Sequence, residues 1–505
     1  MSVFFLRGSV EDEIGFDHRE VFRENCGLAA AINLPGASHL VGQMITTIEK
    51  RGERGGGVVS RREGRLYHRC RIGPFSIQFR EFDQKRFRKE LPGHTAIGHC
   101  RYATKGDPDF VANVQPLTVV ESKYGPFAIA HNGTLVNAEE IKKELIKDGC
   151  AFNSTSDTEI LIHSILDSGE KTLEEAIIFT LRRIQTSYSL LIISRDKVFA
   201  IRDRFGVRPL SIAKIGDGYL ACSETVAFDQ FPEAEYWRDV EPGEMVVFQR
   251  RKKESRSVCY AEAEEMFCIF ESIYFSNPRS RKNGFFHEDF RRRIGMRLAF
   301  SISKHLASEE IPPLIVPVLD SGKYFAEGVA KGLVKLLFDE KRWNFDDMYE
   351  EVFQRAHGPL GGQTRSFTAV STEERIAVVL KKLNLKKEAV KGRTVVVVDD
   401  SIVRSNTAKI IVNMLKRVGA AKVIVVIGFP PIVDICPNGM DFQTRRQLIA
   451  FSRSEEEIRK LIGCDILSYL SPEELLEVVK ETYGCGICGG CFGHRYPVAP
   501  NRVKD

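Results

Sequence analysis

The sequence predicts a two-domain protein, with layered α and β structure in the first half and a parallel-sheet α/β domain in the second. A chain of 505 residues is longer than one domain usually requires. In 26–248, short apolar runs typical of strands alternate with helical stretches, whereas in 264–497 strand, helix and strand follow one another as a parallel sheet requires. The segment 249–263 is charged and lacks periodicity, and we expect it to be a linker.

The expected elements follow from these runs. In the first domain, strands are predicted at 96–98, 127–130, 189–193, 198–202 and 219–222, and helices at 138–147 and 156–166. In the second domain, a helix is predicted at 288–305 and a strand at 314–319, which leads into Asp320-Ser321-Gly322. Two more strands, at 395–398 and 423–427, flank a helical stretch at 409–415. This order predicts a parallel sheet.

Both ends of the chain are expected to lie outside the two domains. Residues 1–25 are rich in acidic residues and lack the apolar core of a secretory signal. We therefore expect them to be an N-terminal extension or a propeptide. Residues 498–505 are expected to form a short tail.

Composition excludes several classes of protein. Lys and Arg total 73 against 68 Asp and Glu, a net charge of +5 that does not call for a nucleic-acid partner in a chain of this size. No apolar run approaches the length that crosses a membrane. We expect a cytoplasmic protein that binds neither nucleic acid nor membrane.

A pair of carboxylates, Asp399 and Asp400, follows the most apolar of the predicted strands. Four valines precede the pair, which places both acids at the rim of the sheet, where ligands of α/β folds bind. Backbone N–H groups at the start of the next helix could face an anion there. Acids beside an anion site favour a phosphorylated substrate bound with a metal ion. The alternative is a solvated acidic pair that only ends a core strand.

The cysteines also point to a metal site. Twelve are present, and a cytoplasmic protein is not expected to use them as a disulfide framework. Cys485, Cys488 and Cys491 follow one another at two-residue intervals in a glycine-rich loop, which suits an iron–sulfur cluster or a zinc ion. Cys268 and Cys436 are available as further ligands. The alternative is a set of reduced thiols without a metal.

The first domain has the residues of an amide-cleaving site. Cys26 is a candidate nucleophile, and cleavage before it would free an α-amine with a pKa of about 7.7–8.0 as its base. Arg101 can hold a carboxylate, and Asp157 can hold an ammonium group. Asn132 and Gly133 can form an oxyanion hole. Together these residues could bind and cleave glutamine.

These motifs together resemble the amidophosphoribosyltransferase family, the glutamine-dependent enzymes that commit phosphoribosyl pyrophosphate to purine synthesis. The matching segments are Cys26-Gly27, Arg51-Gly52, 98–104, Gln115-Pro116, His131-Asn132-Gly133, Ser156-Asp157, 202–210, 223–225, 270–275, 317–322 and 398–404. The resemblance runs from Cys26 to about Pro497, and it rests on the order and spacing of these segments.

The resemblance implies a fold and two reactions. The first domain would be a class II glutamine amidotransferase domain with the layered αββα fold of N-terminal-nucleophile enzymes, and the second a phosphoribosyltransferase domain. Cys26 would form a γ-glutamyl thioester, and the ammonia released would pass through a channel to the second domain. There it would displace pyrophosphate at ribose C1 and give phosphoribosylamine.

The resemblance also assigns residues. Arg101, Thr104 and Asp157 would hold glutamine. Ser321, Asp399 and Asp400 would hold Mg²⁺, and Arg404, Ser405, Asn406 and Thr407 would hold the 5-phosphate. Cys268, Cys436, Cys485 and Cys488 match the ligands of a 4Fe-4S cluster, with Cys491 as an extra thiol that spacing does not exclude as a ligand. A homotetramer inhibited by purine nucleotides is implied as well.

The chain departs from the family pattern at three places. Ser405-Asn406-Thr407 replaces Gly-Thr-Thr, Glu53-Arg54 replaces Gln-Asp, and 363–367 only loosely matches the loop that closes over the substrate. Losing the glycine removes easy access to positive φ. The alternatives are therefore a divergent non-catalytic paralogue that senses nucleotides or acts as a scaffold, and a glutaminase that serves another acceptor.

Overall fold

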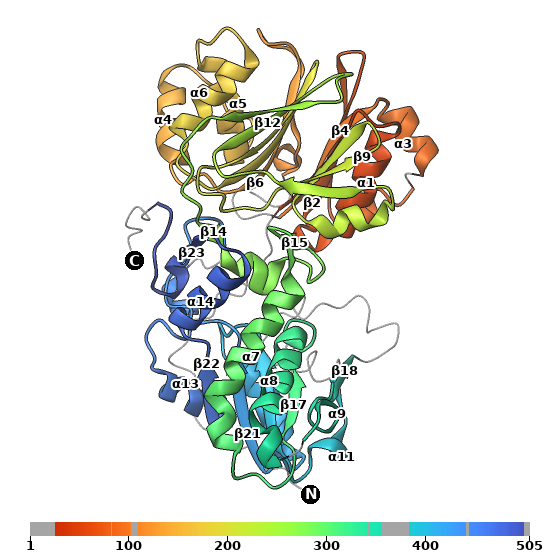
Figure 1. The fold of residues 1–505 in the computed structure, drawn as a ribbon. Helices are drawn as coiled ribbons and strands as arrows, with labels where there is room; N and C mark the ends of the chain where they lie inside the picture. The colour runs from red at the N-terminus through yellow and green to blue at the C-terminus, as the bar shows by residue number, and fades with distance from the viewer. Residues whose placement is uncertain are drawn as a thin grey trace, which may run out of the picture.

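The computed structural model describes residues 26–81, 83–102, 110–341, 343–355, 383–440 and 444–498. Thr104, the segment 363–367 and the first 25 residues lie outside these ranges. Figure 1 shows two bodies joined end to end, with the first half of the chain in the upper body and the second half in the lower one.

Two antiparallel sheets form the centre of the first domain. The first sheet has the order β11-β9-β10-β1-β4-β2-β3, and the second has the order β13-β12-β8-β7-β6-β5. The strands of the first sheet are β1 (Gly27–Ile32), β2 (Gly55–Arg62), β3 (Arg65–Ile72), β4 (Thr95–Arg101), β9 (Ser211–Ile215), β10 (Gly218–Cys222) and β11 (Glu235–Asp239). Those of the second are β5 (Leu117–Val119), β6 (Phe127–Gly133), β7 (Tyr188–Ser194), β8 (Lys197–Arg202), β12 (Glu244–Gln249) and β13 (Ser255–Cys259).

Each sheet buries both faces, and this gives four layers (Figure 1). In β1, Leu28 and Ala30 belong to the core between the two sheets, whereas Ala29 and Ala31 belong to the core under the helices α1 (Ala37–Thr47), α2 (Phe75–Gln78) and α3 (Gln84–Glu90). The helices α4 (Ala138–Lys147), α5 (Asp157–Asp167) and α6 (Leu173–Arg183) cover the outer face of the second sheet. The layered αββα prediction is confirmed.

The expected linker at 249–263 is wrong. Residues Ser255–Cys259 form β13, which pairs with β12 as the edge strand of the second sheet. The side chain of Tyr260 is buried in the core under α4 to α6. The charged composition of the segment reflects an edge strand that is largely open to solvent, so it carries no apolar run.

The second domain is a parallel sheet between two layers of helices. Its strands run in the order β17 (Leu314–Pro317), β20 (Thr394–Asp399), β21 (Lys422–Ile427) and β22 (Ile466–Tyr469). One face packs against α7 (His287–Leu306), α8 (Lys323–Lys341) and α14 (Pro472–Thr482). The other packs against α11 (Lys387–Val390), α12 (Asn406–Arg417) and α13 (Glu455–Ile462). The predicted parallel sheet is confirmed.

Smaller elements join the two domains or extend the second. A π-helix at Glu271–Phe275 and the hairpin of β15 (Arg281–Lys282) and β16 (Phe285–Phe286) precede α7. The short strand β14 (Phe267–Cys268) pairs in parallel with β23 (Ile487–Cys488), which ties the domain junction to the C-terminal part of the chain. The remaining elements are α9 (Phe345–Met348) and the pair β18 (Phe353–Arg355) and β19 (Leu383–Leu385).

The predicted elements agree closely with the observed ones. The helix predicted at 138–147 coincides with α4, and the one predicted at 156–166 begins one residue later because Ser156 is its N-cap and accepts from Thr158 N at 3.3 Å. The strand predicted at 314–319 ends at Pro317. Within the described ranges, no helix is both long and apolar enough to cross a bilayer.

Candidate active sites

Cys26 lies directly before β1, beside the end of β4. The Tyr102 main-chain N–H donates to Cys26 Sγ at 3.4 Å, and Arg51 Nε donates to the Cys26 carbonyl oxygen at 3.1 Å. Burial raises the pKa of the Cys26 thiol to about 12, although the nearby Arg101 guanidinium works in the opposite direction. The thiol is therefore protonated at neutral pH, and a nucleophilic role requires a base.

Two of the predicted glutamine-binding charges are close enough to Cys26 to affect its pKa. Arg101 lowers that pKa and Asp157 raises it. Arg101 ends β4 and is almost fully buried, and Asp157 is the first residue of α5. Asp157 Oδ2 accepts from the Leu135 main-chain N–H at 3.0 Å. The fold thus brings a buried cation and an acid to the same thiol.

Asn132 and Gly133 end β6 on the rim of the second sheet. Asn132 is fully buried, yet neither polar atom of its side-chain amide has a hydrogen-bond partner among the described residues. Burying an amide without a partner is costly, so this group is available to a ligand. Gly133 has φ 149°, and a Cβ there would lie 1.9 Å from the Ser187 carbonyl oxygen, so only glycine fits.

A buried ion-pair network behind Cys26 was not predicted. Arg51 pairs with Glu224 at 3.0 Å and with Glu271 at 2.9 Å, and Glu271 also pairs with Arg208 at 3.1 Å. None of the four side chains is more than 4% exposed. Burial alone would raise the pKa of Glu271, but the guanidinium groups of Arg51 and Arg208 hold that pKa below its usual value. These residues lie within the matching segments, but no local pattern indicates that they meet.

The departure at Glu53-Arg54 does not place a charge in the core. The Arg54 main-chain N–H donates a hydrogen bond to the Arg101 carbonyl oxygen at 3.0 Å. Its side chain is exposed to solvent.

The second candidate site is the rim of the parallel sheet at Asp399 and Asp400. Ser321 Oγ donates to Asp399 Oδ1 at 3.1 Å. A Cβ at Gly322 would lie 2.2 Å from the Val398 carbonyl oxygen, so this glycine lets the turn after β17 lie against the end of β20. The three predicted metal-site residues are therefore brought together.

Both carboxylates at this rim resist ionisation in the absence of a cation. Burial, together with the charge of Asp399, raises the pKa of Asp400 well above its usual value. Burial also raises the pKa of Asp399. Asp400 Oδ2 has no hydrogen-bond partner among the described residues. Two acids and a hydroxyl fit Mg²⁺, which usually takes one or two carboxylates and completes its shell with water and substrate phosphates.

The loop beyond these acids leads into α12, as predicted. Ser405 precedes the helix with φ −75° and ψ −7°, and Asn406 is its first residue. The position that is glycine in the family pattern thus needs no positive φ here, so serine causes no backbone strain. Asn406 and Thr407 are exposed, and Arg404 and Ser405 are half-buried.

The predicted set of cysteines is only partly brought together. The thiols of Cys268 and Cys436 act on the pKa of Cys488 and of Cys491, and burial raises both pKa values further. The charged neighbours of Cys485 are Lys282, Glu265, Arg202 and Asp239, with no cysteine among them. The main charge contacts of Cys491 thus include the thiols of Cys268, Cys436 and Cys488, whereas those of Cys485 include no thiol.

No group of three or more His, Cys, Asp or Glu side chains in the described ranges converges closely enough to hold a single metal ion. A four-iron cluster differs, because each of its cysteines binds a separate iron atom. Cys268, Cys488 and Cys491 are buried and Cys436 is half-buried, and four thiols fit that group in chemistry.

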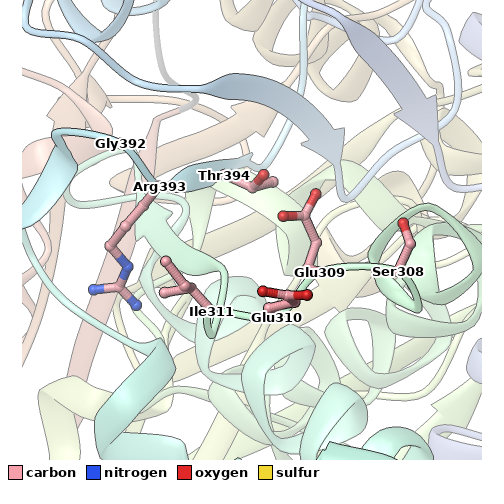
Figure 2. Close-up of a pocket in the computed structure, with 7 residues that line it drawn as sticks. All are labelled: Ser308, Glu309, Glu310, Ile311, Gly392, Arg393 and Thr394. Atoms are coloured by element: carbon pink, nitrogen blue, oxygen red, sulfur yellow. The ribbon is translucent and has the colours of Figure 1, made fainter.

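A cavity of about 330 Å³ lies elsewhere, lined by Ser308, Glu309, Glu310, Ile311, Gly392, Arg393 and Thr394. Figure 2 shows these side chains, of which Thr394 is the first residue of β20. Asp399 is the last residue of the same strand. The Arg393 guanidinium donates to the carbonyl oxygens of Pro312 at 2.9 Å and Asp347 at 2.7 Å, so it already has partners. We assign no substrate to this cavity.

Comparison with known proteins gives two domain matches and full-length relatives. A glutamine amidotransferase domain model matches residues 76–267, and a phosphoribosyl transferase domain model matches residues 290–429. The amidophosphoribosyltransferase of Bacillus subtilis is 35% identical over 485 residues, covering 94% of each chain. That of Methanocaldococcus jannaschii is 34% identical over 478 residues, covering 91% of this chain and 94% of its own.

A solved structure agrees with these relatives. The glutamine phosphoribosylpyrophosphate amidotransferase of B. subtilis, complexed with ADP and GMP, matches with a TM-score of 0.82 at 34% identity. The match covers 94% of this chain and 98% of that one. By sequence and by fold, the chain belongs to the amidophosphoribosyltransferase family.

Proposed function

We propose that this chain carries out the reaction of its family with Cys26 as nucleophile in the first domain and the Asp399–Asp400 rim as the phosphoribosyl site in the second. The reaction converts glutamine, phosphoribosyl pyrophosphate and water into phosphoribosylamine, glutamate and pyrophosphate. The observation that carries the assignment is the fully buried Asn132 amide at the end of β6, which has no hydrogen-bond partner among the described residues.

In the first step, Cys26 Sγ bonds to the amide carbon of glutamine and the C–N bond breaks. The thiol proton leaves with the ammonia, passing through the α-amine of Cys26 once residues 1–25 are removed. Asn132 and Gly133 hold the oxyanion. Arg101 holds the carboxylate of the substrate, and Asp157 holds its ammonium group. Water then hydrolyses the thioester, which releases glutamate and restores the thiol.

In the second step, the nitrogen lone pair of ammonia attacks ribose C1 as the bond to pyrophosphate breaks, and the surplus proton passes to solvent. Bound Mg²⁺ would neutralise charge on the pyrophosphate. Ser321, Asp399 and Asp400 would hold this ion and the ribose hydroxyls, and the residues 404–407 would hold the 5-phosphate at the start of α12. The alternatives of a non-catalytic paralogue and of a glutaminase for another acceptor receive no support from the relatives.

For the cysteines, we propose a 4Fe-4S cluster on Cys268, Cys436, Cys488 and Cys491. The electrostatic grouping of these thiols supports this choice. The chemistry of the reaction transfers no electrons, so the role of the cluster would be structural, joining β14 and the segment around Cys436 to the C-terminal loop.

We also propose that the protein is cytoplasmic and that it forms a homotetramer that purine nucleotides inhibit. The presence of ADP and GMP in the related B. subtilis structure supports nucleotide binding. Sedimentation equilibrium and inhibition curves with ADP and GMP test the two parts separately.

The decisive experiment compares protein that begins at Cys26 with its Cys26→Ala and Asp400→Asn variants. Glutamate and pyrophosphate release are measured with glutamine and with ammonia as nitrogen source. Cys26→Ala should lose glutamine-dependent activity and keep ammonia-dependent activity, because only the first step needs the thiol. Asp400→Asn should lose pyrophosphate release with both sources. Full glutaminase activity in Cys26→Ala, or transfer with neither source in the parent protein, would overturn the proposal.

A further inference from the structure

A segment of the second domain contacts residues that lie next to the strand carrying the oxyanion-hole residues. The Asn438 carbonyl oxygen accepts a hydrogen bond from Ser187 Oγ at 2.9 Å, and the Arg208 guanidinium donates to the same oxygen. Ser187 is fully buried, and Asn438 is only 1% exposed. A Cβ at Gly439 would lie 2.7 Å from Thr134 Oγ1, so the segment packs directly on the residue that follows Gly133.

Ser187 in turn lies directly against the candidate oxyanion hole. Its carbonyl oxygen accepts from Thr134 N at 2.9 Å, and its N–H donates to the Thr134 carbonyl oxygen at 2.8 Å. The Ser187 carbonyl oxygen also occupies the space that a side chain on Gly133 would fill, at 1.9 Å from the Cβ position. A shift of the Ser187 main chain would therefore shift Gly133.

We propose that Ser187 is a positioning residue for glutamine cleavage, held in place by the Asn438 carbonyl of the second domain. The hydroxyl of Ser187 fixes its own main chain, and that main chain sets the place of the Gly133 N–H. This inference rests on the proposed function, because it assumes that Gly133 serves the oxyanion formed by Cys26 attack. It goes further by giving the second domain a part in building the glutaminase site.

The chemistry explains why the hydrogen bond between Ser187 and Asn438 matters. An oxyanion-hole donor acts at about 2.7–3.1 Å from the developing negative charge, and losing one donor costs about 10²–10³ in kcat. Displacing a donor by part of an ångström costs less than losing it. The binding of ground-state glutamine depends instead on the charges of Arg101 and Asp157, which do not take part in the hydrogen bond between Ser187 and Asn438. Loss of this hydrogen bond should therefore lower kcat and leave KM nearly unchanged.

The test uses Ser187→Ala in the protein that begins at Cys26. We expect kcat for glutamine hydrolysis to fall about tenfold, while KM for glutamine and the ammonia-dependent rate stay within about twofold. The matched control is Ser164→Ala. Ser164 is buried in α5 of the same domain, and its hydroxyl has no partner among the described residues, so its loss should change neither rate.

A second variant guards against misfolding of the first. Gly439→Ala leaves the Ser187 hydroxyl intact but presses on Thr134 and requires φ near +97°, so it should lower the same kcat. Thermal melting checks that each variant is folded at the assay temperature. If Ser187→Ala keeps the full kcat, or if its ammonia-dependent rate falls in parallel, the positioning role is wrong. If Cys26→Ala retains glutaminase activity, the proposed function itself fails.

Discussion

The buried carboxylate of Glu271 offers the sharpest test of how the two domains are joined. It accepts from Arg51 at 2.9 Å and from Arg208 at 3.1 Å, and it is fully buried. In Glu271→Gln, Arg51 would keep Glu224 as its partner, whereas the buried Arg208 guanidinium would lose the carboxylate with which it pairs. Removing one partner of a buried pair costs about 3–5 kcal/mol. Because each kcal/mol shifts Tm by about 2–4 °C in domains of this size, we expect Tm to fall by about 6–20 °C.

The same change should reach the glutaminase site. Arg51 Nε donates to the Cys26 carbonyl oxygen, so an Arg51 side chain with one partner fewer would hold Cys26 less firmly. At 20 °C, below the lowered Tm, glutamine-dependent activity should fall several-fold more than ammonia-dependent activity. The two rates and the melting curve are measured on one preparation.

The pH dependence of the effect has a definite sign. The folded-state pKa of Glu271 lies below its usual value, so its contribution is complete above about pH 4.3, the reference value for an unfolded glutamate. The Tm difference between wild type and Glu271→Gln should therefore stay constant between pH 8 and 6. It should shrink as the pH falls below that reference value and the carboxylate becomes protonated.

The control is an ion pair that is exposed on the surface. Lys253 and Asp217 lie 2.7 Å apart, but both side chains are more than 70% exposed. Asp217→Asn should shift Tm by less than about 2 °C, because solvent screens exposed pairs. The reasoning is refuted if Glu271→Gln melts within 2 °C of wild type, or if both variants shift Tm equally.

Three further predictions concern single residues. In the full chain, the raised pKa of Cys26 predicts that its rate of alkylation by iodoacetamide rises about tenfold per pH unit from pH 7 to 9. Peptide mass spectrometry measures this rate, with the exposed Cys259 as the comparison, and rapid alkylation of Cys26 at pH 7 would contradict the burial argument. Asp400→Asn should raise Tm by a few degrees without Mg²⁺, because a buried carboxylate with a raised pKa destabilises the folded protein once the pH is high enough to ionise it. The variant should also abolish the Tm gain from Mg²⁺ with phosphoribosyl pyrophosphate, and an unchanged gain would exclude this carboxylate as a ligand. Cys491→Ser should lower the iron content of anaerobically prepared protein, whereas Cys485→Ser should keep it; the reverse result would restore the grouping expected from sequence.

The elements that were predicted correctly and the rim acids follow from local periodicity, which the sequence shows directly. Buried strands such as β20 read as runs of valine, and its carboxyl end places Asp399 and Asp400 at the sheet rim whatever the remaining topology. Helix α4 was bounded correctly from its 3.6-residue pattern. The edge strand β13 was missed, since a strand that pairs on one side only and faces solvent carries no apolar run.

Which distant groups meet could not be predicted from the sequence. Arg51 and Glu271 are 220 residues apart, and Ser187 and Asn438 are 251 apart, so no spacing rule connects them. Spacing alone excludes none of Cys485, Cys488 and Cys491 as a ligand, whereas in the folded chain the charge contacts of Cys491, and not those of Cys485, include the other thiols. Residue type and local pattern show which chemistry a chain can carry. The packing of two domains against each other decides which of those residues share a site, because desolvation and charge pairing depend on position in space.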